Sequence, residues 1–273
     1  TLLDMEEMPT VEELKAAEKL IYSKTKIFSE FRDSAKLALV CRMILSGDPE
    51  GYFDKVNEVF KMLCEGKIVN NEYRAFAAIN ICSYLGDQDP RAVVDRTNAI
   101  YAKMNEKHKV LTSAEDIPMA ALHAVTNVKV EKLVEEMELD YKALKDKFGA
   151  SGTLQSLSHV TALSHIPSEI RCEKVMNLWD MLKEHKNKYN KANQIIGLGL
   201  FTLIDVPAEV IVDELIETEK YLEKQKGFGA FSLDNDTRRM LASELVYSTH
   251  ASSDKAVDGM ALGSTVASLI ALD

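Results

Sequence analysis

The sequence has few of the features that mark secreted proteins. Its 273 residues include four cysteines, at positions 41, 64, 82 and 172, with no Cys-x-x-Cys pair and no closely spaced framework. Thr1 opens the chain without a charged and apolar leader, so we see no signal peptide. This cysteine usage fits a reducing compartment, and we expect a cytoplasmic protein.

Long apolar runs and an excess of basic residues are also missing. The longest apolar stretch, residues 256–272, is interrupted by Asp258 and by hydroxyl side chains and is too short to span a bilayer. Acidic residues outnumber basic ones by 43 to 33, and the net charge of -10 repels phosphate backbones. We therefore expect neither a membrane nor a nucleic-acid partner. A hydrophobic content of 46% predicts an ordinary folded core.

Five of the six prolines recur at nearly regular intervals. The intervals are 40, 41, 77 and 40 residues, and 77 is close to two periods: Pro9, Pro49, Pro90, Pro167 and Pro207. Proline is tolerated in the first turn of a helix, because the N–H that it lacks would have no intrahelical partner there. The spacing therefore predicts helix starts that repeat about every forty residues.

Apolar residues recur at fixed offsets from these starts. Counting from Thr10, Pro49, Pro90, Val130, Ser168 and Ala208, the position four residues on is Leu14, Phe53, Val94, Val134, Cys172 and Val212. Positions eleven and fourteen on, and positions five and eight before, are also mostly apolar. Offsets of this kind follow the 3.6-residue period of a helix, so each repeat contains two helices with one buried stripe each.

The links that precede the proline markers are short and turn-like, as at residues 46–49 and 86–90, which predicts antiparallel neighbours. The fold class that follows is all-α, an α-solenoid-like stack of five to six antiparallel helical hairpins with a period of about 40 residues. We expect one domain over residues 1–273. Its ends are predicted to be a capping helix within 1–28, where Thr10 and Glu13 have capping-box spacing, and a second at 253–273.

Three segments of the chain resemble an uncharacterised bacterial family, the domain of unknown function number four thousand and three. They are Leu111-Thr112-Ser113-Ala114-Glu115-Asp116 with Pro118, Leu154-Gln155-Ser156-Leu157-Ser158-His159, and Gln225-Lys226-Gly227-Phe228-Gly229. The resemblance implies an all-helical bacterial protein. It brings no catalytic residue, cofactor or substrate.

One group of polar residues interrupts the apolar rows. His159 stands in a row otherwise filled by small or apolar residues, Gln155 precedes it by one turn, and Asp116 and His123 share a face of the preceding helix. Stacking of the third and fourth hairpins could bring these four side chains together. The group is either a satisfied buried network or the lining of a ligand pocket.

The longer links should emerge along one edge of the stack, at residues 67–71, 109–113, 148–153, 188–193 and 227–234. Their hydroxyl residues are typical of helix N-caps, although free N–H groups at helix starts can also hold an anion. Phe228 and Phe231 could anchor their loop inward. The candidate ligand-binding residues are Thr112, Ser113, Asp116, His123, Gln155, Ser158, His159, Phe228 and Gly229.

No pattern predicts catalysis, a metal or a cofactor. His159 and His165 are six residues apart, which places them on different sides of a helix, and Cys41, Cys82 and Cys172 fall in the core rows and should be buried. The favoured function is a non-enzymatic scaffold that binds a protein or peptide. The alternative is a small polar or anionic ligand-binding protein, or an enzyme, with its site between the third and fourth hairpins.

Overall fold

The structure is a computed structural model that describes residues 9–66, 71–126, 128–185, 189–228 and 235–251. Every regular element within these ranges is a helix, as predicted. None of the described helices combines the length and the apolar content that a bilayer crossing requires.

The described residues form two compact units, one up to Val130 and one from Glu131 onward. Unit 1 contains α1 (Val11–Lys24), η2 (Glu30–Arg32), α2 (Ala35–Leu45), α3 (Pro49–Cys64), α4 (Glu72–Tyr84), α5 (Pro90–Lys107), η3 (Ala114–Asp116) and α6 (Ile117–Ala124). Unit 2 contains α7 (Val130–Phe148), α8 (Gly152–Thr161), α9 (Ser168–Glu184), α10 (Ala192–Leu198), η4 (Gly199–Leu203), α11 (Ala208–Glu223) and α12 (Asn235–His250). The single domain over 1–273 stays a prediction, and the C-terminal capping helix at 253–273 lies outside the described residues.

Helices begin at the predicted markers. Prolines open α3 and α5, and each is preceded by an N-cap aspartate: Asp48 accepts a hydrogen bond from the Gly51 amide at 3.0 Å, and Asp89 caps α5 in the same way. Thr10 caps α1 in the predicted capping box, in which the Thr10 amide donates to Glu13 Oε2 at 2.7 Å. The helix predicted within residues 1–28 is thus α1, and its role as a cap of the stack stays a prediction.

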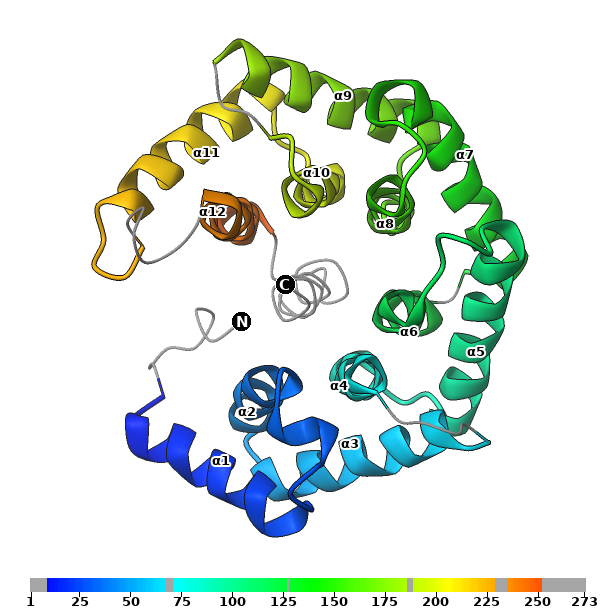
Figure 1. Cartoon of the computed structure of the whole chain (residues 1–273), viewed down its shortest axis with the longest axis vertical. Helices are drawn as coiled ribbons and strands as arrows, with labels where there is room; N and C mark the ends of the chain where they lie inside the picture. Colours follow the sequence, from blue (N-terminus) through cyan, green and yellow to red (C-terminus); the bar gives the residue numbers. More distant parts are fainter. Residues whose placement is uncertain (1–8, 67–70, 127, 186–188, 229–234, 252–273) are drawn as a thin grey trace. The chain divides into compact units, whose positions relative to one another are not determined.

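The core of unit 1 lies between consecutive helices. α4 packs against α2, α3 and α6, and α5 packs against α3 and α6. Figure 1 shows α2, α4 and α6 end-on in a row, with α1, α3 and α5 side-on along it, so the two sets of helices run in different directions. In unit 1, the apolar row predicted four residues after the helix markers is buried at Phe53 and Val94.

Unit 2 is built in the same manner. α10 packs against α8 and α12, and α11 packs against α9 and α12 (Figure 1). The same row is buried at Val134, Cys172 and Val212. The predicted burial of cysteines is confirmed for Cys172, whereas Cys41 of unit 1 is only half-buried, as is its counterpart at position 82.

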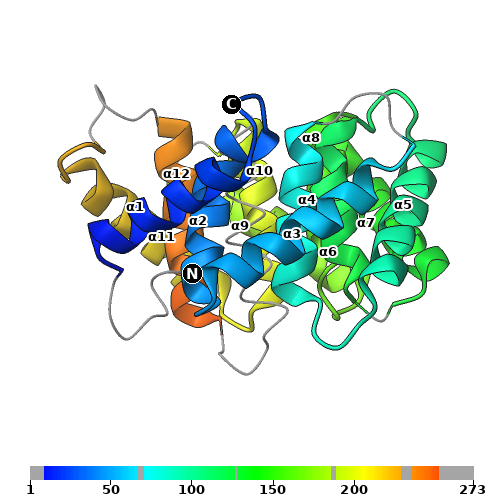
Figure 2. The same ribbon diagram turned by 90° about the horizontal axis from the view of Figure 1, so that it is seen from below.

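The links of unit 1 differ at its two ends, as Figure 2 shows. Short links lead from α2 to α3 and from α4 to α5, and the second turns through Gly86 at a φ of 55°, a conformation that favours glycine. Long links lead from α1 to α2 and from α5 to α6. They contain η2 and η3, which both contact α4, so the two long links flank the same helix.

Candidate functional site

The predicted ligand residues in the link before α6 are used for capping. The Ser113 hydroxyl accepts a hydrogen bond from the Glu115 amide at 3.1 Å, and Asp116 Oδ2 accepts one from the Ser113 amide at 2.9 Å. The Thr112 amide donates to the His108 carbonyl at 2.8 Å. The plain N-cap interpretation is therefore confirmed for Ser113, and the Asp116 carboxylate completes a capping box with it.

The other predicted residues are divided between the units. His123 is fully buried in α6 of unit 1. Gln155, Ser158 and His159 are buried in α8 of unit 2, where the Ser158 hydroxyl donates to the Gln155 carbonyl at 2.7 Å. The meeting of Asp116 and His123 with Gln155 and His159 stays a prediction.

The last two candidates belong to the link between α11 and α12. Phe228 is half-buried, and its carbonyl accepts a hydrogen bond from Arg238 Nη1 at 3.1 Å, so this part of the link is tied to α12. Gly229 and Phe231 lie outside the described residues.

Sequence reasoning missed a buried charged network in unit 2. Asp140 of α7 is fully buried and accepts hydrogen bonds from the Thr161 hydroxyl at 2.6 Å, Arg171 Nε at 2.7 Å and the Ser168 hydroxyl. Arg171 also donates to Glu136 Oε2 at 2.6 Å and to the Ile166 carbonyl at 2.8 Å.

This network has a structural role, because every group named in it bonds to another part of unit 2. Burial lowers the pKa of Arg171, but hydrogen bonds and charge from Asp140 and Glu136 outweigh it, so the net shift is upward and the guanidinium stays charged. A buried ion pair with all its hydrogen bonds made fixes the relative positions of α7, α8 and α9.

The repeat contains a signal for this pair. Ten residues after the helix markers the row reads Leu20, Val59, Ile100, Asp140, Leu178 and Thr218. Three residues after them it reads Glu13, Tyr52, Val93, Leu133, Arg171 and Ile211. Opposite charges in two mostly apolar rows of adjacent repeats predict a buried ion pair.

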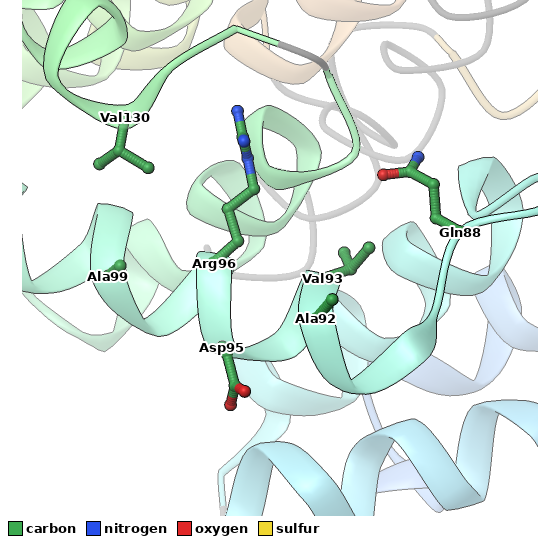
Figure 3. A pocket seen from close by; sticks show the side chains of 7 residues that line it. All are labelled: Gln88, Ala92, Val93, Asp95, Arg96, Ala99 and Val130. Atoms are coloured by element: carbon green, nitrogen blue, oxygen red, sulfur yellow. The ribbon is translucent and has the colours of Figure 1, made fainter.

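A groove of about 490 Å³ lies beside α5, and Figure 3 shows its lining. Arg96 points toward the backbone that leads to Val130 and donates to the Val128 carbonyl, whereas Asp95 points the opposite way. Gln88 Nε2 donates to the Val125 carbonyl at 3.0 Å. Arg96 and Gln88 thus hold the link between α6 and α7, and the rest of the lining is Ala92, Val93, Ala99 and Val130.

The link from α1 to α2 presents apolar side chains to solvent. Ile27 is 77% exposed and Phe28 is 97% exposed. The link is nevertheless well held: Phe31 is buried with its ring centroid 4.9 Å from that of Phe60, and Arg32 Nε donates to the Thr25 hydroxyl at 2.8 Å. These contacts fix the backbone on the C-terminal side of Phe28, so the folded link itself holds this side chain in its exposed position.

The link from α5 to η3 has the same character. Val110 is 95% exposed and follows Lys109, which is also exposed. The Leu111 amide donates to the His108 carbonyl at 3.0 Å, which closes a turn with Lys109 and Val110 at its tip. We call Lys26, Ile27, Phe28, Lys109 and Val110 the unit-1 edge.

The unit-1 edge also has a signal in the sequence. A lysine followed by two apolar residues occurs in each of the first three long links, as Lys26-Ile27-Phe28, Lys67-Ile68-Val69 and Lys109-Val110-Leu111. The middle copy lies outside the described residues. The lysines are 41 and 42 residues apart, so the triplet follows the repeat.

A family model described as a protein of unknown function, DUF4003, matches residues 5–273. The chain belongs to the DUF4003 family. This confirms the resemblance drawn from its three segments. No curated protein and no solved structure matches the chain. The description of DUF4003 names no reaction or ligand, so a function for this DUF4003 protein has to be argued from its own residues.

The Asp140–Arg171 pair should dominate the stability of unit 2. We expect Arg171→Met to lower the free energy of unfolding by about 3–5 kcal/mol, because it leaves Asp140 charged and buried. The double variant Asp140→Leu, Arg171→Met should lose much less than the two single variants together. Urea unfolding followed by circular dichroism measures this, with the exposed Lys103→Met as control. Additive losses would contradict the assignment.

The thiols of this DUF4003 protein should react slowly. Burial raises the pKa of all four thiols, to about 11 for Cys64 and to about 12 for Cys82 and Cys172. At Cys172 the negative charge of Asp140 raises the pKa further. Alkylation of the native chain by iodoacetamide at pH 8 should be about 100-fold slower at positions 64, 82 and 172 than in the urea-unfolded chain. Mass spectrometry gives the rates, and equal rates in both states at any of these three would contradict this.

Glu244 of α12 should make stability depend on pH. Burial raises its pKa to about 7, above the 4.5 of an ordinary glutamate. The native state therefore binds the proton of Glu244 more tightly than the unfolded state does. The resulting stabilisation of the native state is complete below about pH 4.5 and is lost as the pH rises through 7.

We expect Glu244→Gln to raise the free energy of unfolding by about 1–2 kcal/mol at pH 8, with allowance for the partial exposure of this side chain, and to leave it unchanged at pH 4. Urea titrations at the two pH values test this, with the exposed Glu217→Gln as control. An equal effect of Glu244→Gln at both pH values would argue against the raised pKa.

Proposed function

We propose that this DUF4003 protein is a non-enzymatic helical-repeat protein that binds a protein or peptide partner at the unit-1 edge. The predicted stack of hairpins belongs to this proposal, because repeated two-helix units present regularly spaced links along one side. Partners of repeat proteins bind to such regular surfaces by shape and charge.

The exposure of Phe28 carries the proposal. Single exposed apolar side chains are ordinary on a protein surface, but Ile27 and Phe28 are adjacent and lie on a link that buried and hydrogen-bonded neighbours hold. Covering a phenylalanine side chain contributes about 1.5–3 kcal/mol to association. Together with Val110, these side chains offer an anchor of the kind that is enriched in interface centres.

Lysines beside the apolar tips add specificity. Lys26 and Lys109 are exposed next to the apolar residues, in a chain whose net charge is -10. Charged groups at the rim of an interface mainly guide association and exclude wrong partners. The unit-1 edge therefore fits a surface or segment that combines apolar side chains with carboxylates.

The test compares what the full chain captures from an extract of the source organism. The variant Phe28→Asp, Val110→Asp should lose at least nine-tenths of the specifically bound protein, because a charge replaces each apolar contact. The matched control Leu139→Asp, Tyr221→Asp alters two exposed apolar residues of unit 2 and should retain it.

Quantitative mass spectrometry of the bound fraction gives the result, with circular dichroism to check that the variants keep their helices. Equal retention by the edge variant and the wild type would contradict the proposed surface, and so would a wild type that captures nothing above an unrelated protein.

A further inference from the structure

We propose that the partner of the unit-1 edge is a second copy of this chain, which docks through an acidic and apolar face of its unit 2. The inference rests on the proposed function, since it names the occupant of the same edge. It comes from a complementary pattern that two helices of unit 2 carry.

The acidic face lies near the starts of α9 and α11. Each helix presents an exposed glutamate, an exposed aliphatic residue beside it and an exposed acidic residue three positions later: Glu169, Ile170 and Glu173 on α9, and Glu209, Val210 and Asp213 on α11. Ile170 is 55% exposed and Val210 is 41% exposed. We call these six residues the unit-2 face.

The two triplets occupy equal positions after the starts of α9 and α11, two helices that pack against each other. The apolar tips of the unit-1 edge likewise lie on two links whose short helices, η2 and η3, both contact α4.

The two surfaces are complementary in charge and alike in apolar character. The unit-1 edge places Lys26 and Lys109 beside exposed apolar residues, and the unit-2 face places carboxylates beside Ile170 and Val210. Exposed ion pairs contribute little affinity, so burial of the apolar tips provides most of the attraction and the charges set the register.

Docking of one surface on a different one is head-to-tail. Each copy that binds through its unit-1 edge still offers its unit-2 face, so association continues with rising concentration unless the copies close into a ring. Lysine–carboxylate pairs in water are screened by salt, so the association should weaken as ionic strength increases.

Sedimentation velocity of the purified full chain over a wide concentration range tests the inference. The sedimentation coefficient of the wild type should rise with protein concentration and should fall again when salt is added. The edge variant Lys26→Glu, Lys109→Glu and the face variant Glu169→Lys, Glu209→Lys should each associate at least tenfold more weakly.

A mixture of the edge variant and the face variant is the decisive arm. The unaltered face of the first meets the unaltered edge of the second, so the mixture should recover association that neither variant shows alone. The control Lys132→Glu, Lys142→Glu makes the same change in net charge at exposed positions of α7 and should associate as the wild type does.

A wild type that stays monomeric at every concentration, reversed variants that associate normally, or a mixture that stays monomeric would each overturn the inference. If the pure chain is monomeric while its unit-1 edge still captures a different protein from the extract, the second-copy inference fails and the proposed function stands. If the variant Phe28→Asp, Val110→Asp also captures all the protein that the wild type does, the second-copy inference and the proposed function both fail.

Discussion

The structure depends on burial of one apolar stripe per helix, repeated about every forty residues. Residues such as Phe53, Val94 and Val134 stand four positions after successive helix starts and are almost fully buried, each against the neighbouring helices of its unit. Within each unit, the packing of neighbouring helices covers these stripes. The side chains that stay exposed on the surface do not contribute to this core, and they include the residues of the unit-1 edge.

Polar residues inside the units serve the fold. The Ser113–Asp116 capping box satisfies the start of η3, and Asp140 with Arg171 joins three helices of unit 2 through a closed set of hydrogen bonds. The unit-1 edge has the opposite character, because it presents apolar side chains to water on links whose backbones are fixed from inside.

Much of the fold could be predicted because it follows from local rules. Pro49 and Pro90 begin helices since proline suits a first turn, and Thr10 with Glu13 forms the capping box that their spacing predicts. The buried pair was missed because one charged residue in an apolar row does not predict an ion pair by itself. The signal appears only when the row that contains Asp140 is compared with the row that contains Arg171. The directions in which neighbouring helices run depend on how their side-chain ridges interlock, and a period of forty residues does not contain that information.

The exposure of the unit-1 edge could not be predicted from composition or periodicity alone. Phe28 and Phe31 are three residues apart in one link, yet one is 97% exposed and the other 1% exposed. Which of the two turns inward depends on the Ser29 cap and on the hydrogen bonds of Arg32, which form only in the folded unit. The repeated lysine-apolar triplet indicates the place, and the structure supplies the direction in which its side chains point.

Site-specific photo-cross-linking tests the central claim most directly, that the unit-1 edge is the surface on which a partner protein lies. A photoreactive phenylalanine analogue at position 28 should yield a discrete protein adduct on irradiation, whether with a second copy or with another protein. The same analogue at position 139, an exposed leucine of unit 2, should not yield that adduct. No adduct from position 28, or the same adducts from both positions, would contradict the account.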